Sequence, residues 1–368
     1  MLAVATAFTQ ACAPATGVSG ADANGVVLAP GFSSRVIARG GETVPGTDLQ
    51  FRIFPDGAAT FVDPEVPGGW YLAVNHEVPL AQGGVTSIRF APDGSVAGAR
   101  SICSGTSSNC AGGATPWGTW LTGEEWDGGY IWECDPTGAV PARRLEGMGA
   151  FKHEAAAVAD DDRVYLTEDR PDGAFYRFTP DVPGQLDRGL LEVACGAAPG
   201  PVTWQPVPDP RPTWDRTATR HQLASTMPFD GGEGVATDGT AVWFTTKGDD
   251  RVWQYDTVAE QVSLRYQAGG ASALSGGDNL WFDADSGALL VAEDGGDMEV
   301  LVLRPDNTVE AIAGLPGHEH SEVAGPCFSP DGQRLYFSSQ RAPVGPLSTV
   351  AGVLYEVTGP FDELLGRV

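Results

Sequence analysis

The sequence predicts an all-β fold, a six-bladed β-propeller. Two observations predict it: the frequency of turn-forming residues, and a repeat of short hydrophobic strands. The 368 residues include 49 Gly and 28 Pro, and turns rich in Gly, Pro and Asp separate short runs of Val, Trp, Tyr and Phe. Such punctuation is typical of strands joined by tight turns.

The repeat consists of a turn, a hydrophobic strand and a polar or charged tip. It occurs six times, at "GGWYLAVNHE" (68–77), "GTWLTGEE" (118–125), "DRVYLTEDR" (162–170), "TAVWFTTKGD" (240–249), "GALLVAEDGG" (287–296) and "QRLYFSSQ" (333–340). Another strand follows several of these, as in "GGYIWECDP" (128–136) and "RVWQYD" (251–256). Three or four strands in each of six units describe a propeller rather than a large sandwich.

Four of the units have a further strand just upstream, headed by an acidic residue. These strands are "HEAAAVADDD" (153–162), "GEGVATDG" (232–239), "DNLWFDADSG" (278–287) and "SEVAGPCFSPDG" (321–332). Asp-Gly or Asp-Asp turns link them to the next strand as hairpins. All-β folds of this length often form one unit and no linker is visible, so we expect a single propeller domain over residues 26–368.

Acidic residues recur at the same strand end, and a propeller would bring them to one end of its central channel. The residues are Glu77, Glu124, Glu154, Glu233, Glu293 and Glu322. Two unit charges ~4 Å apart repel by about 4 kcal/mol at an effective dielectric constant near 20. The cluster must therefore protonate or hold cations. Its oxygen-rich ligands favour Ca²⁺, Mg²⁺ or Mn²⁺ over zinc, and irregular carboxylates suit the flexible coordination of Ca²⁺ best. The sequence therefore predicts a metal site with several Ca²⁺ ions at one end of the channel.

The adjacent pair Glu124 and Glu125 poses a question of orientation. Side chains alternate along a strand, so one of the two faces the channel and the other faces away. We expect Glu124 to point at the cluster and Glu125 to have a supporting or surface role.

The charge balance excludes some partners. The chain has 48 acidic and 22 basic side chains, a formal net charge of −26. This argues against a nucleic-acid partner. No segment approaches the ~18 consecutive apolar residues of a membrane span. The expected protein is a monomer that acts on a small molecule.

The N-terminus and the cysteines indicate an exported protein. Residues 1–25 are interpreted as an export-signal remnant and flexible N-terminus, with Cys12 as a candidate lipid-attachment site. The six cysteines suit an oxidising compartment, and a disulfide between Cys103 and Cys110 would close the short polar segment between them. The expected location is secreted, periplasmic or at the cell surface.

Several segments, in order, resemble the signature motifs of the PhoX-type alkaline phosphatases. They include "GWYLAVNHE", "NCAGGATPWGTWLTGEEW", "FKHEAAAV", "VYLTEDRPDGAFYRFTP", "LLVAEDGG" and "SEVAGPCFSPDGQRLYFSSQ". The resemblance implies an exported six-bladed propeller that hydrolyses phosphate monoesters with bound calcium and iron. It implies that the six glutamates are metal ligands, that Asn75 contacts phosphate, and that Asn75, Glu124 and Glu293 are catalytic; no organic cofactor is expected.

The sequence departs from the family at one position. Where the family has "TCEE", this chain has "TGEE", with Gly123 in place of the cysteine that binds iron. No other cysteine is expected to replace it, which leaves the iron-dependent form of the site open.

The expected function is a calcium-dependent phosphatase in which a metal-activated water or oxo group attacks a phosphate monoester. Two alternatives stay open. One is a calcium-binding surface propeller without catalysis, and the other is a calcium-dependent lactonase or phosphotriesterase. The number of metals per chain distinguishes the phosphatase from the lactonase, which would need one.

Overall fold

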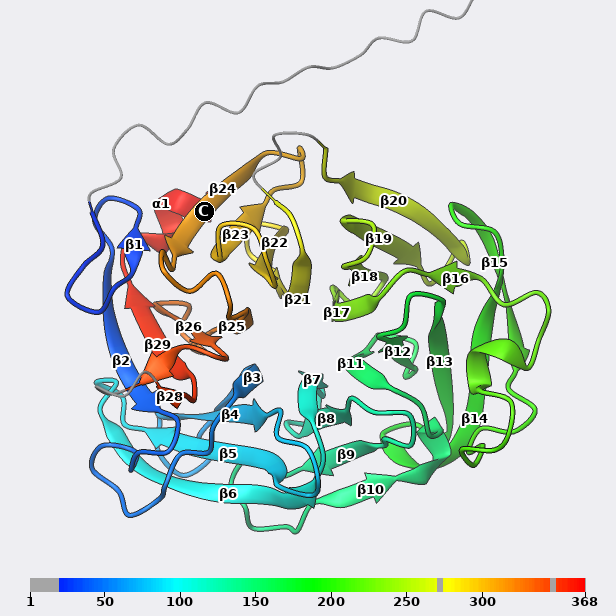
Figure 1. The fold of residues 1–368 in the computed structure, drawn as a ribbon, viewed down its shortest axis with the longest axis horizontal. Helices are drawn as coiled ribbons and strands as arrows, with labels where there is room; N and C mark the ends of the chain where they lie inside the picture. The colour runs from blue at the N-terminus through cyan, green and yellow to red at the C-terminus, as the bar shows by residue number, and fades with distance from the viewer. Residues whose placement is uncertain (1–19, 270–273, 345–348, 368) are drawn as a thin grey trace, which may run out of the picture.

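Strands make up most of the ordered elements of the computed structural model, which describes residues 20–269, 274–344 and 349–367. Figure 1 shows antiparallel sheets standing around a common centre. The predicted all-β fold is confirmed, and its arrangement is that of a propeller. Residues 1–19, which include Cys12 and most of the predicted export remnant, lie outside the described part.

Two sheets near the N-terminus each follow chain order. The first contains β3 (Pro55–Val62), β4 (Trp70–His76), β5 (Gly83–Phe90) and β6 (Val96–Thr106). The second contains β7 (Asn109–Ala114), β8 (Trp120–Glu124), β9 (Ile131–Cys134) and β10 (Arg143–Leu145).

The middle of the chain forms two four-stranded runs that one extra strand joins. The first run is β11 (His153–Val158), β12 (Val164–Glu168), β13 (Gly173–Val182) and β14 (Gln185–Gly196). The second run is β17 (Gly232–Thr237), β18 (Ala241–Thr246), β19 (Arg251–Asp256) and β20 (Gln261–Gln267). Strand β15 (Gly200–Pro206) pairs with both β14 and β20, and β16 (Pro228–Phe229) pairs with β13.

The last two large sheets each include a strand from the start of the described chain. Strand β1 (Val27–Leu28) joins β21 (Gly277–Asp283), β22 (Ala288–Glu293), β23 (Glu299–Leu303) and β24 (Val309–Gly314). Strand β2 (Ser33–Arg39) pairs with β29 (Val353–Thr358), in the sheet that also holds β25 (Val323–Phe328) and β26 (Arg334–Ser339). Strands near the two ends of the described chain thereby pair within one sheet.

Minor elements complete the fold. They are the pair β27 (Pro343–Val344) and β28 (Thr349–Val350), the 3₁₀ turns η1 (Glu146–Met148) and η2 (Thr219–His221), and the helix α1 (Phe361–Leu365). Among the described residues, no helix has the length and hydrophobicity that crossing a bilayer requires.

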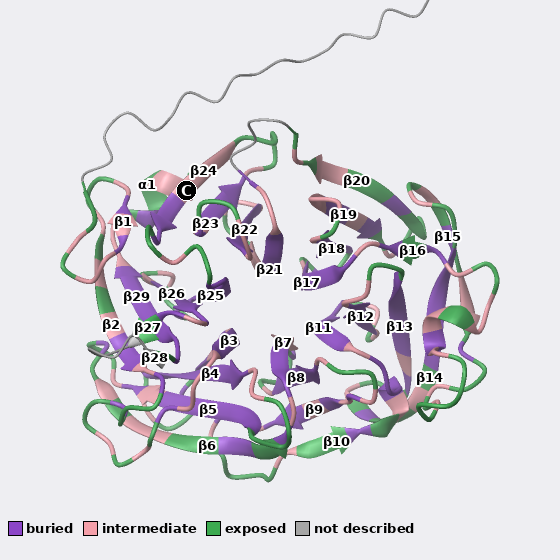
Figure 2. Ribbon diagram, in the orientation of Figure 1, coloured by how far each residue is buried: buried purple, intermediate pink, exposed green. Residues whose placement is uncertain are grey.

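Inner strands surround the centre and contact one another in a closed ring, in the order β3, β7, β11, β17, β21 and β25. They are largely buried, as Figure 2 shows. The predicted hairpins are present: Asp238 and Gly239 turn β17 into β18, and Asp331 and Gly332 turn β25 into β26. The starts of the inner strands therefore meet at one end of the centre.

Candidate metal centre

A β-bulge interrupts the pairing near the start of each inner strand. In β11, His153 pairs with Glu168 but the next regular pair is Ala156 with Leu166, so the inner strand has one residue more than its partner. A bulge bends the strand and re-aims a side chain. Register shifts at the matching place occur in β3, β7, β17 and β21. The residues at the re-aimed positions are Asp56, Cys110, Glu154, Glu233 and Asp278.

A second set of side chains comes from the residue that directly follows the second strand of each sheet. These residues are Glu77, Glu125, Asp169, Lys247, Asp294 and Gln340. In the last sheet Ala324 is still regularly paired and the register shift follows it, and Glu322, just before β25, supplies the carboxylate instead. The site is thus built from equivalent positions in successive sheets.

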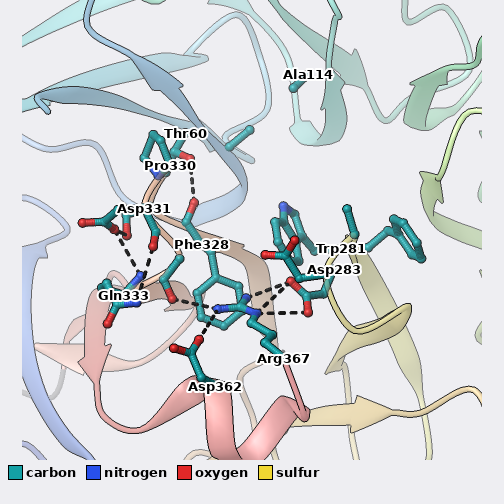
Figure 3. A pocket seen from close by; sticks show the side chains of 16 residues that line it. Thr60, Ala114, Trp281, Asp283, Phe328, Pro330, Asp331, Gln333, Asp362 and Arg367 are labelled. Carbon is teal, nitrogen blue, oxygen red and sulfur yellow. Dashed lines mark hydrogen bonds and ion pairs between the residues drawn. The ribbon is translucent and has the colours of Figure 1, made fainter. Parts of the chain in front are cut away.

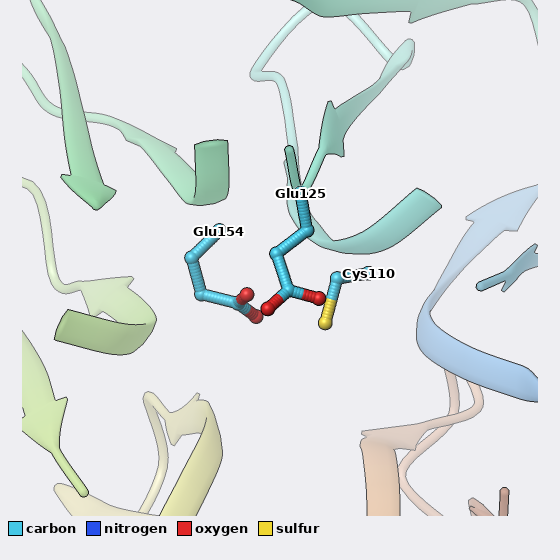
Figure 4. A group of neighbouring side chains, drawn as sticks. All are labelled: Cys110, Glu125 and Glu154. Atoms are coloured by element: carbon cyan, nitrogen blue, oxygen red, sulfur yellow. The ribbon is translucent and has the colours of Figure 1, made fainter. Parts of the chain in front are cut away.

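Most of these residues fall into four groups, and within each group the ligand atoms lie within 4.8 Å of one another. The groups are Cys110, Glu125 and Glu154 (Figure 4); Asp56, Glu77 and Glu322; Glu154, Glu233 and Asp278; and Asp278, Asp294 and Glu322. Since Glu154, Asp278 and Glu322 each belong to two groups, the groups form one connected cluster.

Three basic side chains border the cluster. Lys152 Nζ lies 2.7 Å from Glu125 and also pairs with Asp169, while Lys247 Nζ lies 2.8 Å from Glu233 and 3.0 Å from Asp294. Arg341 lies 2.7 Å from Glu322. Eight carboxylates of the four groups therefore face three cations, which leaves a large negative excess.

Burial makes this excess costly. Glu154 is 0% exposed, and neither of its carboxylate oxygens has a hydrogen-bond partner. Burial, with the nearby Glu233 charge, raises the pKa of Glu154 well above its usual range, and burial does the same for Glu322. Burial and the Glu125 charge raise the pKa of Glu77 to about 8. Unpartnered buried carboxylates at such spacing fit cations, which would supply the missing partners.

The structure brings together four of the six predicted glutamates: Glu77, Glu154, Glu233 and Glu322. It does not bring Glu124 or Glu293 into any group. The expected orientation of the acidic pair is reversed, because Glu125 joins the cluster and Glu124 faces into its own sheet.

Glu124 and Glu293 share a different environment. Glu124 accepts hydrogen bonds from the backbone N–H groups of Ser107 (2.9 Å) and Tyr130 (3.2 Å) and from Trp132 Nε1 (3.0 Å). Glu293 accepts from the N–H groups of Ser275 (2.9 Å) and Glu299 (3.2 Å). Each is the last residue of a second strand, so alternation turns it away from the centre and toward the next connection.

Asn75 is fully buried, and both polar atoms of its side chain are hydrogen-bonded. Its side-chain nitrogen donates to the carbonyls of Cys110 (2.8 Å) and Ala111 (2.9 Å), and its oxygen accepts from Trp120 Nε1 (2.8 Å). Its described contacts therefore hold the bulged segment that carries Cys110, and the phosphate contact expected of Asn75 stays a prediction.

Cys110 corrects the expectation that no cysteine could replace the one missing at position 123. Its thiol lies with Glu125 and Glu154, although the residue belongs to the neighbouring strand β7. The predicted Cys103–Cys110 disulfide is wrong in this structure, where both cysteines are free and buried.

Close packing against the next inner strand explains why position 123 has a glycine. A Cβ added there would lie 2.7 Å from the carbonyl oxygen of Glu154 and 2.9 Å from that of His153, which are backbone atoms of the next inner strand. A thiol at this position would need the two strands to separate.

We expect Gly123→Ala to lower the free energy of unfolding by about 1–3 kcal/mol through overpacking. Urea unfolding of the metal-free protein measures it. Gly98→Ala is the matched control, because an added Cβ there meets nothing within 4 Å. Equal stability of the two variants would contradict the packing argument.

Sequence reasoning missed Asp56, Cys110, Glu125, Asp278 and Asp294 as members of the cluster. A usable signal existed, since the residue after each second strand is polar or charged in every repeat. The bulges, which aim Asp56, Cys110 and Asp278 inward, have no marker in the hydrophobic pattern.

A cavity of about 560 Å³ lies at the other end of the inner strands. Its walls include Thr60, Trp281, Phe328 and the ion pair of Arg367 with Asp283 (Figure 3). It contains no member of the four groups, and the unpartnered Glu154 carboxylate points to the acidic end as the site of chemistry.

Comparisons with known proteins agree with this geometry. The family model of alkaline phosphatase PhoX matches residues 83–128 and 126–260. The structure of Pseudomonas fluorescens PhoX in complex with vanadate, a transition state analogue, is 18% identical, with a TM-score of 0.73 over 93% of this chain and 97% of that one.

More distant structures share only the fold. A protein of unknown function from Dyadobacter fermentans is 10% identical with a TM-score of 0.53, covering 90% of this chain and 100% of that one. A luciferin-regenerating enzyme is 13% identical with a TM-score of 0.51, covering 89% and 96%. No curated protein matches the sequence significantly. The family match, which includes Glu124, Glu154 and Glu233, and the shared fold confirm the predicted resemblance to the PhoX alkaline phosphatases.

Proposed function

We propose that this protein is a metal-dependent phosphatase that hydrolyses phosphate monoesters at the acidic end of its channel. The observation that carries the proposal is the connected set of four ligand groups around the unpartnered Glu154 carboxylate. Four groups support a site with several metals, as the phosphatase requires, over the single calcium of the lactonase alternative.

The four groups differ in the chemistry of their ligands. Three groups contain only carboxylates and suit Ca²⁺, which binds flexible sets of oxygen ligands. The group of Cys110, Glu125 and Glu154 adds a sulfur ligand, which suits a softer metal such as iron. The iron-dependent form left open by Gly123 thus regains a candidate ligand in Cys110.

The bound ions would neutralise the phosphoryl oxygens and activate a water as the nucleophile. The chain's own part is to hold the ions and to orient the substrate. Lys152, Lys247 and Arg341 stand at the partly exposed border of the cluster, each paired with a carboxylate. Cations that take over these carboxylates would free the basic groups to attract an anionic substrate.

Hydrolysis of p-nitrophenyl phosphate by the calcium- and iron-loaded protein tests the proposal. We expect turnover that a chelator abolishes and added metal restores. Turnover that survives complete metal removal would refute the metal dependence. A fully loaded protein that hydrolyses no phosphate monoester would refute the phosphatase and leave the non-catalytic calcium-binding propeller.

Cys110→Ser tests the sulfur ligand separately. We expect the variant to lose most of its bound iron and to keep most of its calcium, because the other three groups remain intact. Elemental analysis of the purified protein measures both. Cys327→Ser, a buried cysteine in an apolar cluster, is the control. Unchanged iron in Cys110→Ser would contradict the assignment.

The remaining expectations belong to the same proposal. The closed ring of inner strands supports six blades, with the runs β11–β14 and β17–β20 as separate blades. We also propose that the protein is an exported monomer that acts on a small phosphoester.

A further inference from the structure

Two buried cysteines outside the metal centre belong to the same apolar cluster. Cys103 belongs to β6 and Cys134 ends β9, so they come from neighbouring sheets. Cys103 is 5% exposed and Cys134 is 0% exposed. Beside them, Ser87 Oγ donates to the Pro136 carbonyl (2.6 Å) and Arg100 Nη1 to the Thr137 carbonyl (2.9 Å), which holds β5 and β6 against the turn that follows Cys134. The apolar cluster also contains Ile102 and Trp120.

The other cysteines of the described chain are placed differently. Cys110 lies with Glu125 and Glu154, while Cys195 and Cys327 belong to two separate apolar clusters. Cys103 and Cys134 are therefore the two described cysteines that share one apolar cluster.

The surroundings give the two sulfurs unequal roles. The Cys134 and Thr106 side chains and the nearby Arg52 charge lower the pKa of the Cys103 thiol. Arg52 Nη1 also donates to the Cys103 carbonyl at 3.3 Å. Thiol–disulfide exchange begins with attack by a thiolate, so Cys103 is suited to be the attacking sulfur.

We propose that Cys103 and Cys134 form a disulfide that fastens the first sheet to the second. The Cys103 thiolate attacks oxidised glutathione, forms a mixed disulfide and releases one glutathione thiolate. The Cys134 thiol then loses its proton to solvent, and its sulfur attacks the Cys103 sulfur and releases the second glutathione. Two protein thiols are oxidised and one glutathione disulfide is reduced to two thiols.

The bond would enclose β7 and β8, the strands that lead to Cys110 and Glu125. It would constrain the unfolded chain and hold this part of the metal centre against the first sheet. The inference is independent of the phosphatase proposal, because it concerns thiols that lie outside the four groups.

The test uses the full chain, directed by a bacterial secretion leader to the oxidising periplasm. Thiols are alkylated under denaturing conditions and counted by mass, before and after chemical reduction. We expect two fewer alkylated thiols per chain before reduction, and a cross-linked peptide that contains positions 103 and 134 in the unreduced digest. Reduction should lower the melting temperature by about 5 °C.

Variants identify the pair. In Cys103→Ser and in Cys134→Ser, the number of alkylated thiols should be the same before and after reduction. Reduction should also leave the melting temperature of these variants unchanged. Cys110→Ser is the matched control and should keep the loss of two thiols. An unchanged thiol count in the parent chain, or loss of the cross-link in Cys110→Ser, would overturn the proposal. The digest gives this answer even where a serine variant folds poorly.

Discussion

Glu154→Gln is expected to lower phosphatase turnover by at least about 100-fold, the loss that even outer partners of metal ligands can cause. Glu154 belongs to two of the four ligand groups, and it is the fully buried carboxylate whose oxygens lack hydrogen-bond partners. A neutral amide offers one weaker oxygen ligand where the carboxylate offers two. The variant should therefore lose metal from two groups at once.

Activity assays with matched elemental analysis measure this effect. Glu124→Gln is the control, because Glu124 is also a buried glutamate but faces its own sheet and belongs to none of the groups. It should keep its metals, while its stability falls through weakened hydrogen bonds. If Glu124→Gln lost metal and Glu154→Gln kept it, the assignment of the cluster would be wrong.

The metal-free protein is expected to lose stability as the pH rises from about 4.5 to 8. Burial raises the pKa of Glu77 from 4.5 to about 8 and that of Glu125 to about 7, and those of Glu154, Glu233, Asp278 and Glu322 also rise. The folded chain thus binds more protons than the unfolded chain in this range. The contribution of these groups to the free energy of unfolding is fully present below pH 4.5. It is lost as the pH rises through the raised pKa values, by about 1.4 kcal/mol for each unit by which a pKa is raised.

Bound calcium should remove this pH dependence, because cations replace the protons and are released when the pH falls. Melting temperatures between pH 4.5 and 8, with and without calcium, measure the difference. In the metal-free protein, Glu77→Gln should show a smaller decline than the parent chain. A melting temperature of the metal-free protein that rises steadily toward pH 8 would show that these carboxylates are not held in the protonated form.

The fold could be predicted from the sequence because strands and tight turns depend on residues that are close together in the chain. The turns at Asp238–Gly239 and Asp331–Gly332 mark hairpins without reference to the rest of the chain. Recurring acids also predicted that one end of the centre would be acidic. Four of the predicted glutamates lie there.

The choice between neighbouring residues depended on features that the sequence does not mark. Glu124 and Glu125 differ by one position, so an error of one residue in the strand end exchanges the inward side chain for the outward one. Bulges at Cys110 and Asp278 shift the alternation again. Cys110 was overlooked because its partners Glu125 and Glu154 come from other strands, and only the folded ring brings them together.

The pairing of β2 with β29 limits when the proposed metal centre could be assembled. The ligands extend from Asp56 to Glu322, and the sheet that contains β25 is completed by a strand from each end of the chain. A nascent chain that is still being synthesised cannot assemble the whole cluster. Under the proposed function, metal loading would be a late event, and the ions available in the compartment where the finished chain closes its ring would decide which metals the protein carries.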